Sequence, residues 1–128
     1  MGMKKLAIIA DAWKRYVNYA WVYGCEKYIV EHNLDVEVDV FHCFGNMSKD
    51  ESNNIGEYNI INLPDAFVCA NENIAVGLCQ KAMDKGYKIP EDFKITGFDD
   101  FDKASYFEPR ITTVGYSKED IAYEAMKL

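Results

Sequence analysis

The sequence has no hydrophobic run long enough to cross a bilayer. Its apolar segments reach at most five residues, as in Leu6 to Ala10, whereas a membrane-spanning helix needs about 20. The first residues also lack the apolar stretch and the small-residue cleavage site of a secretory signal peptide. We therefore expect a cytoplasmic protein that makes no use of a membrane.

Basic residues are in the minority. The 128-residue chain carries 14 Lys and Arg against 21 Asp and Glu, which gives a formal charge of −7. The basic residues are scattered in pairs such as Lys4-Lys5 and Lys14-Arg15, whereas binding to nucleic acid needs a clustered basic face that neutralises phosphates. We predict no nucleic-acid binding by this chain.

Motifs for nucleotide binding and hydrolysis are absent as well. Neither G-x-G-x-x-G nor G-x-x-x-x-G-K-[ST] occurs, so phosphate groups lack a backbone cradle and a lysine, and there is no G-x-S-x-G nucleophile motif. The histidines, His32 and His42, are expected at a helix end and inside a strand. A phosphate-accepting receiver domain needs an aspartate after its middle strand, where this chain has Asn71. We expect no enzyme activity and no cofactor.

The cysteines do not form a metal-binding or redox motif. No two of the four cysteines have the C-x-x-C spacing, and no histidine is placed to complete a zinc site. The cysteines are Cys25, Cys43, Cys69 and Cys79. Each lies among apolar residues, which is typical of buried free thiols in a reducing compartment. We therefore predict no metal site.

Strand-like and helix-like segments alternate along the chain. Short apolar runs bounded by charge are typical of strands buried on both faces of a parallel sheet, and an alternating pattern predicts an edge strand. Together they predict a three-layer α/β sandwich. Strands are expected at Lys5–Ala10, Val36–Phe44 (the edge), Ala66–Ala70, Phe93–Phe98 and Ile111–Val114, with helices at Tyr16–His32, over Ile74–Met83 and after Ser117, and a weak one within Ser48–Asp65.

Three local signals mark the ends of these helices. Asn33 and Gly86 tolerate a left-handed backbone, so we expect the helices before them to stop there. The pair Ser117-x-x-Asp120 predicts the start of the last helix, because a serine hydroxyl can cap free backbone N–H groups.

Polar and aromatic residues follow the predicted strands at their carboxyl ends, where ligands bind in open α/β sheets. The candidate ligand contacts are Asp11, Trp13, Tyr16, Asn71 and Asp99. Acceptor groups beside aromatic rings suit sugars, whose apolar ring face stacks while their hydroxyls donate. Structural roles remain open, since Asn71 suits a helix N-cap, Asp99 a turn, and Trp13 and Tyr16 first-turn packing.

Three motifs resemble the carboxyl-terminal lobe of LacI/GalR-family effector-binding domains, which are related to periplasmic sugar-binding proteins. The segment from Lys4 to about Asp65 separately resembles the start of the amino-terminal lobe, in the version fused to diguanylate cyclase (GGDEF) outputs. The resemblance implies a sensor domain of two lobes that close on a sugar or similar small molecule. The motifs are Pro64–Gly77, Gly86–Asp100 and Pro109–Val114.

The chain has about half the residues that such a two-lobed domain needs. The two portions meet at Pro64-Asp65, so we interpret residues 1–128 as a single lobe, a chimera or internally truncated domain of 4–65 and 66–128. Its expected sheet is five-stranded and flavodoxin-like, in the order 2-1-3-4-5. By resemblance, Asn71 and Asp99 match positions that hydrogen-bond an effector, and Asp11 and Trp13 lie near those of the opposite lobe.

Three functional hypotheses follow. The first is a single-lobe remnant that binds its sugar-like ligand weakly or not at all, because half a cleft leaves the ligand solvated. The second is a sensing module that completes its cleft as a homodimer. The third, from topology alone, is a flavodoxin-like enzyme or electron carrier.

Overall fold

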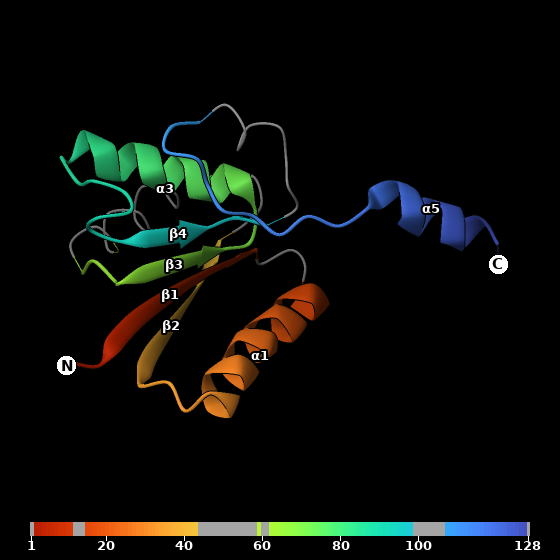
Figure 1. The fold of residues 1–128 in the computed structure, drawn as a ribbon, viewed down its shortest axis with the longest axis horizontal. Coiled ribbons are helices and arrows are strands. Elements are labelled where there is room, and N and C mark those ends of the chain that lie inside the picture. Colours follow the sequence, from red (N-terminus) through yellow and green to blue (C-terminus); the bar gives the residue numbers. More distant parts are fainter. Residues whose placement is uncertain (1, 12–14, 44–58, 60–61, 99–106, 128) are drawn as a thin grey trace.

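A parallel sheet with helices on both faces forms the body of the protein. The elements are β1 (Lys4–Asp11), α1 (Arg15–Glu31), β2 (Val36–Cys43), β3 (Ala66–Cys69), α3 (Glu72–Asp84), β4 (Lys94–Thr96) and α5 (Lys118–Met126). The computed structural model describes residues 2–11, 15–43, 59, 62–98 and 107–127. The strands lie in the order β2-β1-β3-β4, and Figure 1 shows α1 and α3 on opposite sides of the sheet. The predicted α/β class, with a parallel sheet, is confirmed.

Strand β1 lies inside the sheet because it is apolar on both faces. Its Leu6 is level with Val38 of β2 on one side and with Ala66 of β3 on the other. Residues 7–10 of β1 are no more than 2% exposed, as expected for a strand covered on both faces. The alternating pattern of β2 predicts one face partly exposed to solvent, and β2 lies at one edge of the sheet.

The predicted helix ends are confirmed. Asn33, just after α1, has a φ of 49°, and Gly86, just after α3, has a φ of 90°. Both are the left-handed conformations that stop a helix. At the start of α5 the hydroxyl of Ser117 accepts a hydrogen bond from the backbone N–H of Asp120 at 3.2 Å.

The structure corrects the prediction of a fifth strand at Ile111 to Val114. In the described part of the chain this segment joins β4 through one parallel bridge, between Thr96 and Thr112, and forms no ladder. Strand β4 has only three residues and so offers a short edge, and Pro109 has no backbone N–H to donate. Among the described residues the sheet therefore has four strands, in the order 2-1-3-4, in place of the five predicted.

The core lies between the sheet and α3. Alternate residues of β1 and β3 point to this side, and α3 lays its apolar stripe over them. Removing such side chains from water stabilises the fold by about 1.5–3 kcal/mol for each large one. The core consists of Ala7, Ile9, Phe67, Cys69, Ala75, Leu78, Cys79, Ala82, Phe93, Ile95 and Ile111.

The opposite face of the sheet is only partly covered. Helix α1 lies on this side (Figure 1), yet none of its residues from Ala20 to Glu31 is buried. Tyr28 is 57% exposed and Val30 is 73% exposed. The side of α1 that carries Trp21, Cys25 and Ile29, all half-buried, borders an open space beside β3 and β4.

Two buried thiols belong to the α3 side of the sheet. Cys69 and Cys79 are buried and Cys25 is half-buried, and none of these three forms a disulfide bond. Burial raises the pKa of the Cys79 thiol to about 11, and burial together with Glu26 raises that of Cys25. Cys69 and Cys79 are therefore buried thiols as predicted, whereas Cys25 is only half-buried.

The weak helix expected within Ser48–Asp65 falls mostly outside the described residues. Asn59, which the structure does describe, is 2% exposed. None of the helices in the described residues is both long enough and apolar enough to span a membrane.

Asp65 ties three strands together at the amino end of β3. Its backbone N–H donates to the carbonyl of Lys5 at 2.9 Å, and its own carbonyl accepts from the N–H of Lys94 at 3.0 Å. Its carboxylate accepts from the backbone N–H of Lys5 at 2.8 Å and from Lys4 Nζ at 3.4 Å. The N–H of Lys5, followed by the ammonium of Lys4, lowers the pKa of Asp65 below its ordinary 3.8.

We expect this carboxylate to stabilise the fold in a pH-dependent way. A lowered folded-state pKa contributes stability above the unfolded pKa, and that contribution is lost as the pH falls through the folded value. Urea unfolding at a series of pH values should show Asp65→Asn less stable than the unmodified chain near pH 7, where the unfolded carboxyl is ionised. The difference should shrink below about pH 4. A difference that is constant with pH would contradict this role.

Candidate functional site

The carboxyl edge of the sheet brings together residues that follow β1 and β3. Asp11 is the last residue of β1, and Asn71 comes two residues after β3. The two strands are parallel neighbours, with Ile9 level with Cys69, and the N–H of Ala70 donates to the carbonyl of Ile9 at 2.8 Å. The paired register ends at Ile9 and Cys69, so Asp11 and Asn71 both follow it at the carboxyl edge of the sheet.

Asn71 is the N-cap of α3, as one of its predicted roles requires. Its backbone is extended, with φ −158°, and its side-chain Oδ1 accepts from the backbone N–H of Ile74 at 3.0 Å. The side chain is half-buried. Its amide group also carries two N–H donors, so capping and ligand contact use different atoms of the same side chain.

Glu72 anchors the segment after β4 to the first turn of α3. Its side chain is fully buried, and Oε1 accepts a hydrogen bond from the hydroxyl of Thr113. Gly97 lies against it, because a Cβ added there would come within 3.1 Å of Glu72 Cγ. The backbone N–H of Gly97 also donates to the carbonyl of Thr112 at 2.8 Å. Glu72 therefore fixes this edge from inside and does not face an open cleft.

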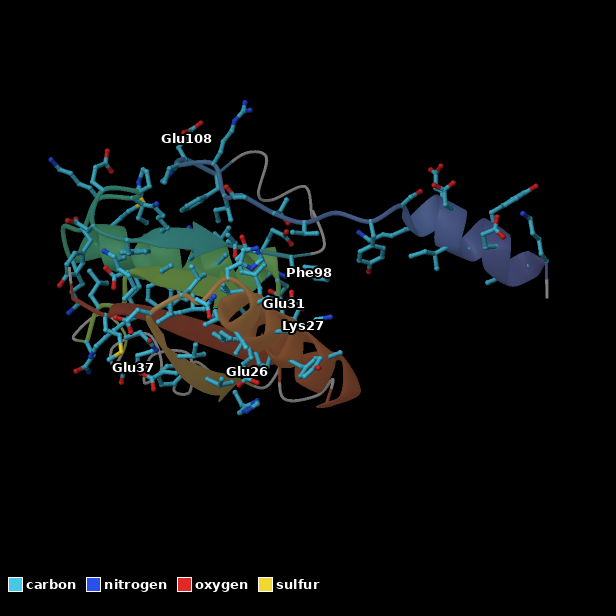
Figure 2. All side chains as sticks on the ribbon, turned by 60° about the horizontal axis from the view of Figure 1, so that its bottom comes forward. Glu26, Lys27, Glu31, Glu37, Phe98 and Glu108 are labelled. Atoms are coloured by element: carbon cyan, nitrogen blue, oxygen red, sulfur yellow. The ribbon has the colours of Figure 1, made fainter. Side chains whose placement is uncertain are left out.

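Three aromatic rings from separate segments lie in a row next to this edge. Trp21 of α1 meets Phe98 edge to face at a centroid distance of 6.1 Å, and Phe98 lies 6.3 Å from Tyr116. Phe98 is labelled beside α1 in Figure 2. Sequence reasoning missed this row, because its members are separated along the chain and only Trp21 lies on a predicted stripe. Edge-to-face contacts of this kind stabilise by about 0.5–1.5 kcal/mol.

The remaining predicted site residues are placed only in part. Tyr16 belongs to the first turn of α1, near the carboxyl edge where Asp11 ends β1. Trp13 and Asp99 lie outside the described residues. In the described part of the chain, no group of three or more His, Cys, Asp or Glu side chains is arranged to hold a metal ion.

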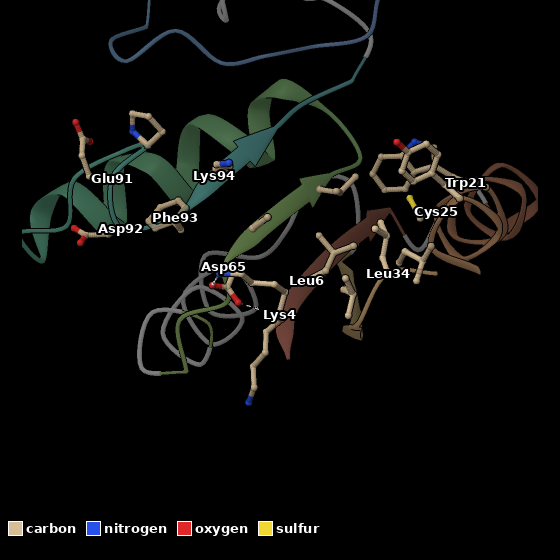
Figure 3. Close-up of a pocket in the computed structure, with 18 of the residues that line it drawn as sticks. Lys4, Leu6, Trp21, Cys25, Leu34, Asp65, Glu91, Asp92, Phe93 and Lys94 are labelled. Atoms are coloured by element: carbon tan, nitrogen blue, oxygen red, sulfur yellow. Dashed lines mark hydrogen bonds and ion pairs between the residues drawn. The ribbon is translucent and has the colours of Figure 1, made fainter. Parts of the chain in front are cut away.

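A groove of about 820 Å³ lies on the α1 face of the sheet and not at the carboxyl edge. Figure 3 shows Leu6 from β1 on its floor, with Trp21 and Cys25 of α1 at one side. Phe93 and Lys94, at the start of β4, lie at the other side. We call this the α1 groove. Its lining is mostly apolar, and charged side chains gather where the strands begin.

Comparison with known proteins identifies the family. A model of the periplasmic binding protein-like domain matches residues 1–128. The repressor PurR of Vibrio atlanticus is 29% identical over 118 residues, 92% of this chain and 32% of the repressor. The crystal structure of the transcription regulator CcpA of Lactococcus lactis is 31% identical with a TM-score of 0.80, over 98% of this chain and 46% of that one. A LacI-family regulator from Enterococcus faecium with bound ribose has a TM-score of 0.75 at 19% identity, over 98% of this chain and 46% of that one.

The chain belongs to the periplasmic binding protein-like domains. Within that class it is a LacI/GalR-type ligand-binding domain of about one lobe, and it spans less than half the length of these relatives. They are named as regulators and not as enzymes, in agreement with the expectation that the chain is not an enzyme. The comparisons lend no support to a link with diguanylate cyclase or to a chimeric origin. The separate ancestry of 4–65 and 66–128 stays a prediction.

Proposed function

We propose that this chain is the effector-binding lobe of a LacI/GalR-type sensor and that, by itself, it binds a sugar-like molecule weakly at its carboxyl edge. The observation that carries the proposal is the position of Asn71, which follows β3 by two residues and caps α3 at the carboxyl edge of the sheet, the edge at which β1 ends at Asp11. Amide donors such as those of Asn71 and carboxylates such as that of Asp11 are groups that pair with sugar hydroxyls.

The other proposed contacts lie along the same carboxyl edge as Asp11 and Asn71 in the sequence pattern. Asp99 follows Thr96 of β4 by three residues, as Asn71 follows Val68 of β3, and Val68 and Thr96 are level in the sheet. Trp13 and Tyr16, between β1 and the body of α1, would supply ring faces for stacking. The effector would then lie across the ends of three adjacent strands.

Weak binding follows from the geometry of a single lobe. Pockets for small molecules bury most of the ligand surface, whereas one lobe covers only one side of it. Binding still costs the ligand its translational and rotational freedom. We expect a dissociation constant of about 1 mM or weaker, equivalent to about −4 kcal/mol.

Ribose is the probe for the test, because a LacI-family structure similar to this chain contains it. In an NMR titration, we expect ribose to shift the amide signals of residues 69–72 without saturating in the micromolar range. Asn71→Asp should abolish the shifts, since aspartate caps a helix as well as asparagine does but has no amide donors. Asn73→Asp, at an exposed position of α3, is the matched control and should leave them unchanged.

Two results would contradict the proposal. A micromolar dissociation constant would show that one lobe suffices for binding. Shifts confined to the α1 groove would place the ligand on the wrong surface.

A further inference from the structure

The first turn of α3 lies directly against the end of β4. A Cβ added to Gly97, the residue after β4, would come within 3.1 Å of Glu72 Cγ and 3.3 Å of Glu72 Cα. Glu72 is the first residue of α3 and is fully buried, so it has no solvent to move into. Close-packed interiors pass such a displacement on to their neighbours. The spacing between β4 and α3 at this edge is therefore set by Glu72 packed on a glycine.

Three consecutive residues hold this contact in place. Ile111 is 6% exposed and packs in the core on the α3 side of the sheet. The carbonyl of Thr112 accepts from the backbone N–H of Gly97 at 2.8 Å, and the hydroxyl of Thr113 donates to Oε1 of Glu72. One short segment therefore binds both partners of the close contact, Gly97 through its backbone and Glu72 through its side chain.

The turn that is held in this way is the one that Asn71 caps. The side-chain Oδ1 of Asn71 accepts from the N–H of Ile74 at 3.0 Å, and its backbone carbonyl accepts from the N–H of Ala75 at 3.2 Å. Glu72 lies within this capped turn, so a shift of Glu72 moves the backbone to which the Asn71 side chain is hydrogen-bonded. The direction of the Asn71 amide donors therefore depends on the contact between Glu72 and Gly97.

We propose that Glu72, Gly97 and Thr113 are positioning residues of the effector site, which hold Asn71 in the geometry that binds the ligand. The inference rests on the proposed function, because it concerns the same carboxyl edge. Glu72 is fully buried and so acts through Asn71 and not on the ligand itself. A polar group binds a ligand best when packing and hydrogen bonds around it fix its direction. A ligand that prefers this geometry also stabilises it, since such coupling is reciprocal.

Gly97→Ala tests the positioning most directly. The added methyl group has to displace Glu72 by a few tenths of an ångström, and with it the turn that Asn71 caps. In an NMR titration with ribose, we expect the dissociation constant to rise about fivefold or more. Gly77→Ala, at an exposed position of α3, is the matched control, because a Cβ added there meets nothing within 4 Å. It should leave ribose binding unchanged.

Thr113 provides a second pair of variants. Thr113→Val removes the hydroxyl that holds Glu72 and should weaken ribose binding by a similar factor, whereas Thr113→Ser keeps the donor and should bind as the unmodified chain does. Asp65→Asn separates this effect from a general loss of stability, because Asp65 lies at the opposite edge of the sheet. It should be less stable near pH 7 and still bind ribose unchanged. If it binds ribose as weakly as Thr113→Val does, the role of Thr113 is structural only, and the proposal is overturned.

Amide hydrogen exchange without ribose tests the positioning separately from the proposed function. The N–H of Ile74 is bound by Asn71 Oδ1, so its exchange should be about tenfold faster, relative to the amides inside β1, in Gly97→Ala and in Thr113→Val. It should be unchanged in Gly77→Ala. An unmodified chain that does not respond to ribose contradicts the proposed function, and the exchange at Ile74 then decides on the positioning. Unchanged exchange in either variant, or unchanged affinity in either variant of a chain that binds ribose, overturns the proposal.

Discussion

Replacement of Phe93 by alanine is expected to lower the free energy of unfolding by about 3–5 kcal/mol. The ring is 2% exposed and meets Phe67 edge to face at a centroid distance of 5.1 Å. Its loss leaves a cavity between β4 and α3 as well as the cost of lost burial. Thermal unfolding should show a midpoint about 10–20 °C lower.

Tyr23→Ala is the control for this prediction. It removes a ring of similar size from α1 at a position that is 66% exposed, so its effect should stay within about 0.5 kcal/mol. Equal losses for the two variants would mean that Phe93 does not lie in the core.

Thr113→Val is expected to destabilise the fold by about 1.5–3 kcal/mol, because it removes a hydroxyl that donates to a buried carboxyl group. Valine has nearly the shape of threonine, so the loss reports on the hydrogen bond to Glu72 and not on packing. The same contact ties the segment after Ile111 to α3. We therefore also expect faster amide hydrogen exchange at Gly97, whose N–H donates to Thr112.

Thr113→Ser separates the hydroxyl from the methyl group. Serine keeps the donor, so urea unfolding should place this variant well above Thr113→Val in stability. If the two variants lose the same free energy, the hydrogen bond does not hold this edge.

The strands and helices that follow a local rule could be predicted from the sequence. The run at Leu6 to Ala10 is apolar at every position, which indicates burial on both faces and so an inner strand. Asn33 and Gly86 end their helices because a left-handed backbone is needed there. These rules involve neighbours in sequence only.

The prediction of a fifth strand was wrong because a segment forms a strand only where a neighbouring strand can pair with it. Ile111 to Val114 contains the β-branched residues that favour extended backbone, and Ile111 is buried as a strand residue would be. The neighbouring strand β4 has only three residues, however, so a single bridge at Thr112 takes the place of a ladder.

The site residues that follow a strand directly in the sequence could be predicted. The contacts between segments far apart in the chain could not. Asn71 follows a strand and precedes a helix, which suggests both capping and ligand contact. The pairing of Glu72 with Thr113 joins residues 41 positions apart, and the ring row joins α1 to two later segments. No local pattern encodes these contacts. The open groove beside α1 could not be predicted from the sequence either. Helical periodicity shows that a helix has an apolar face but not what covers that face.

The central claim is that the two halves of this chain form one continuous parallel sheet. Nuclear Overhauser contacts between backbone atoms of β1 and β3 test it most directly, because Ile8 is level with Val68 and Leu6 with Ala66. The account predicts cross-strand contacts at both pairs, together with contacts from β1 to β2. A β1 that contacts β2 alone, with β3 and β4 in a separate body, would contradict it.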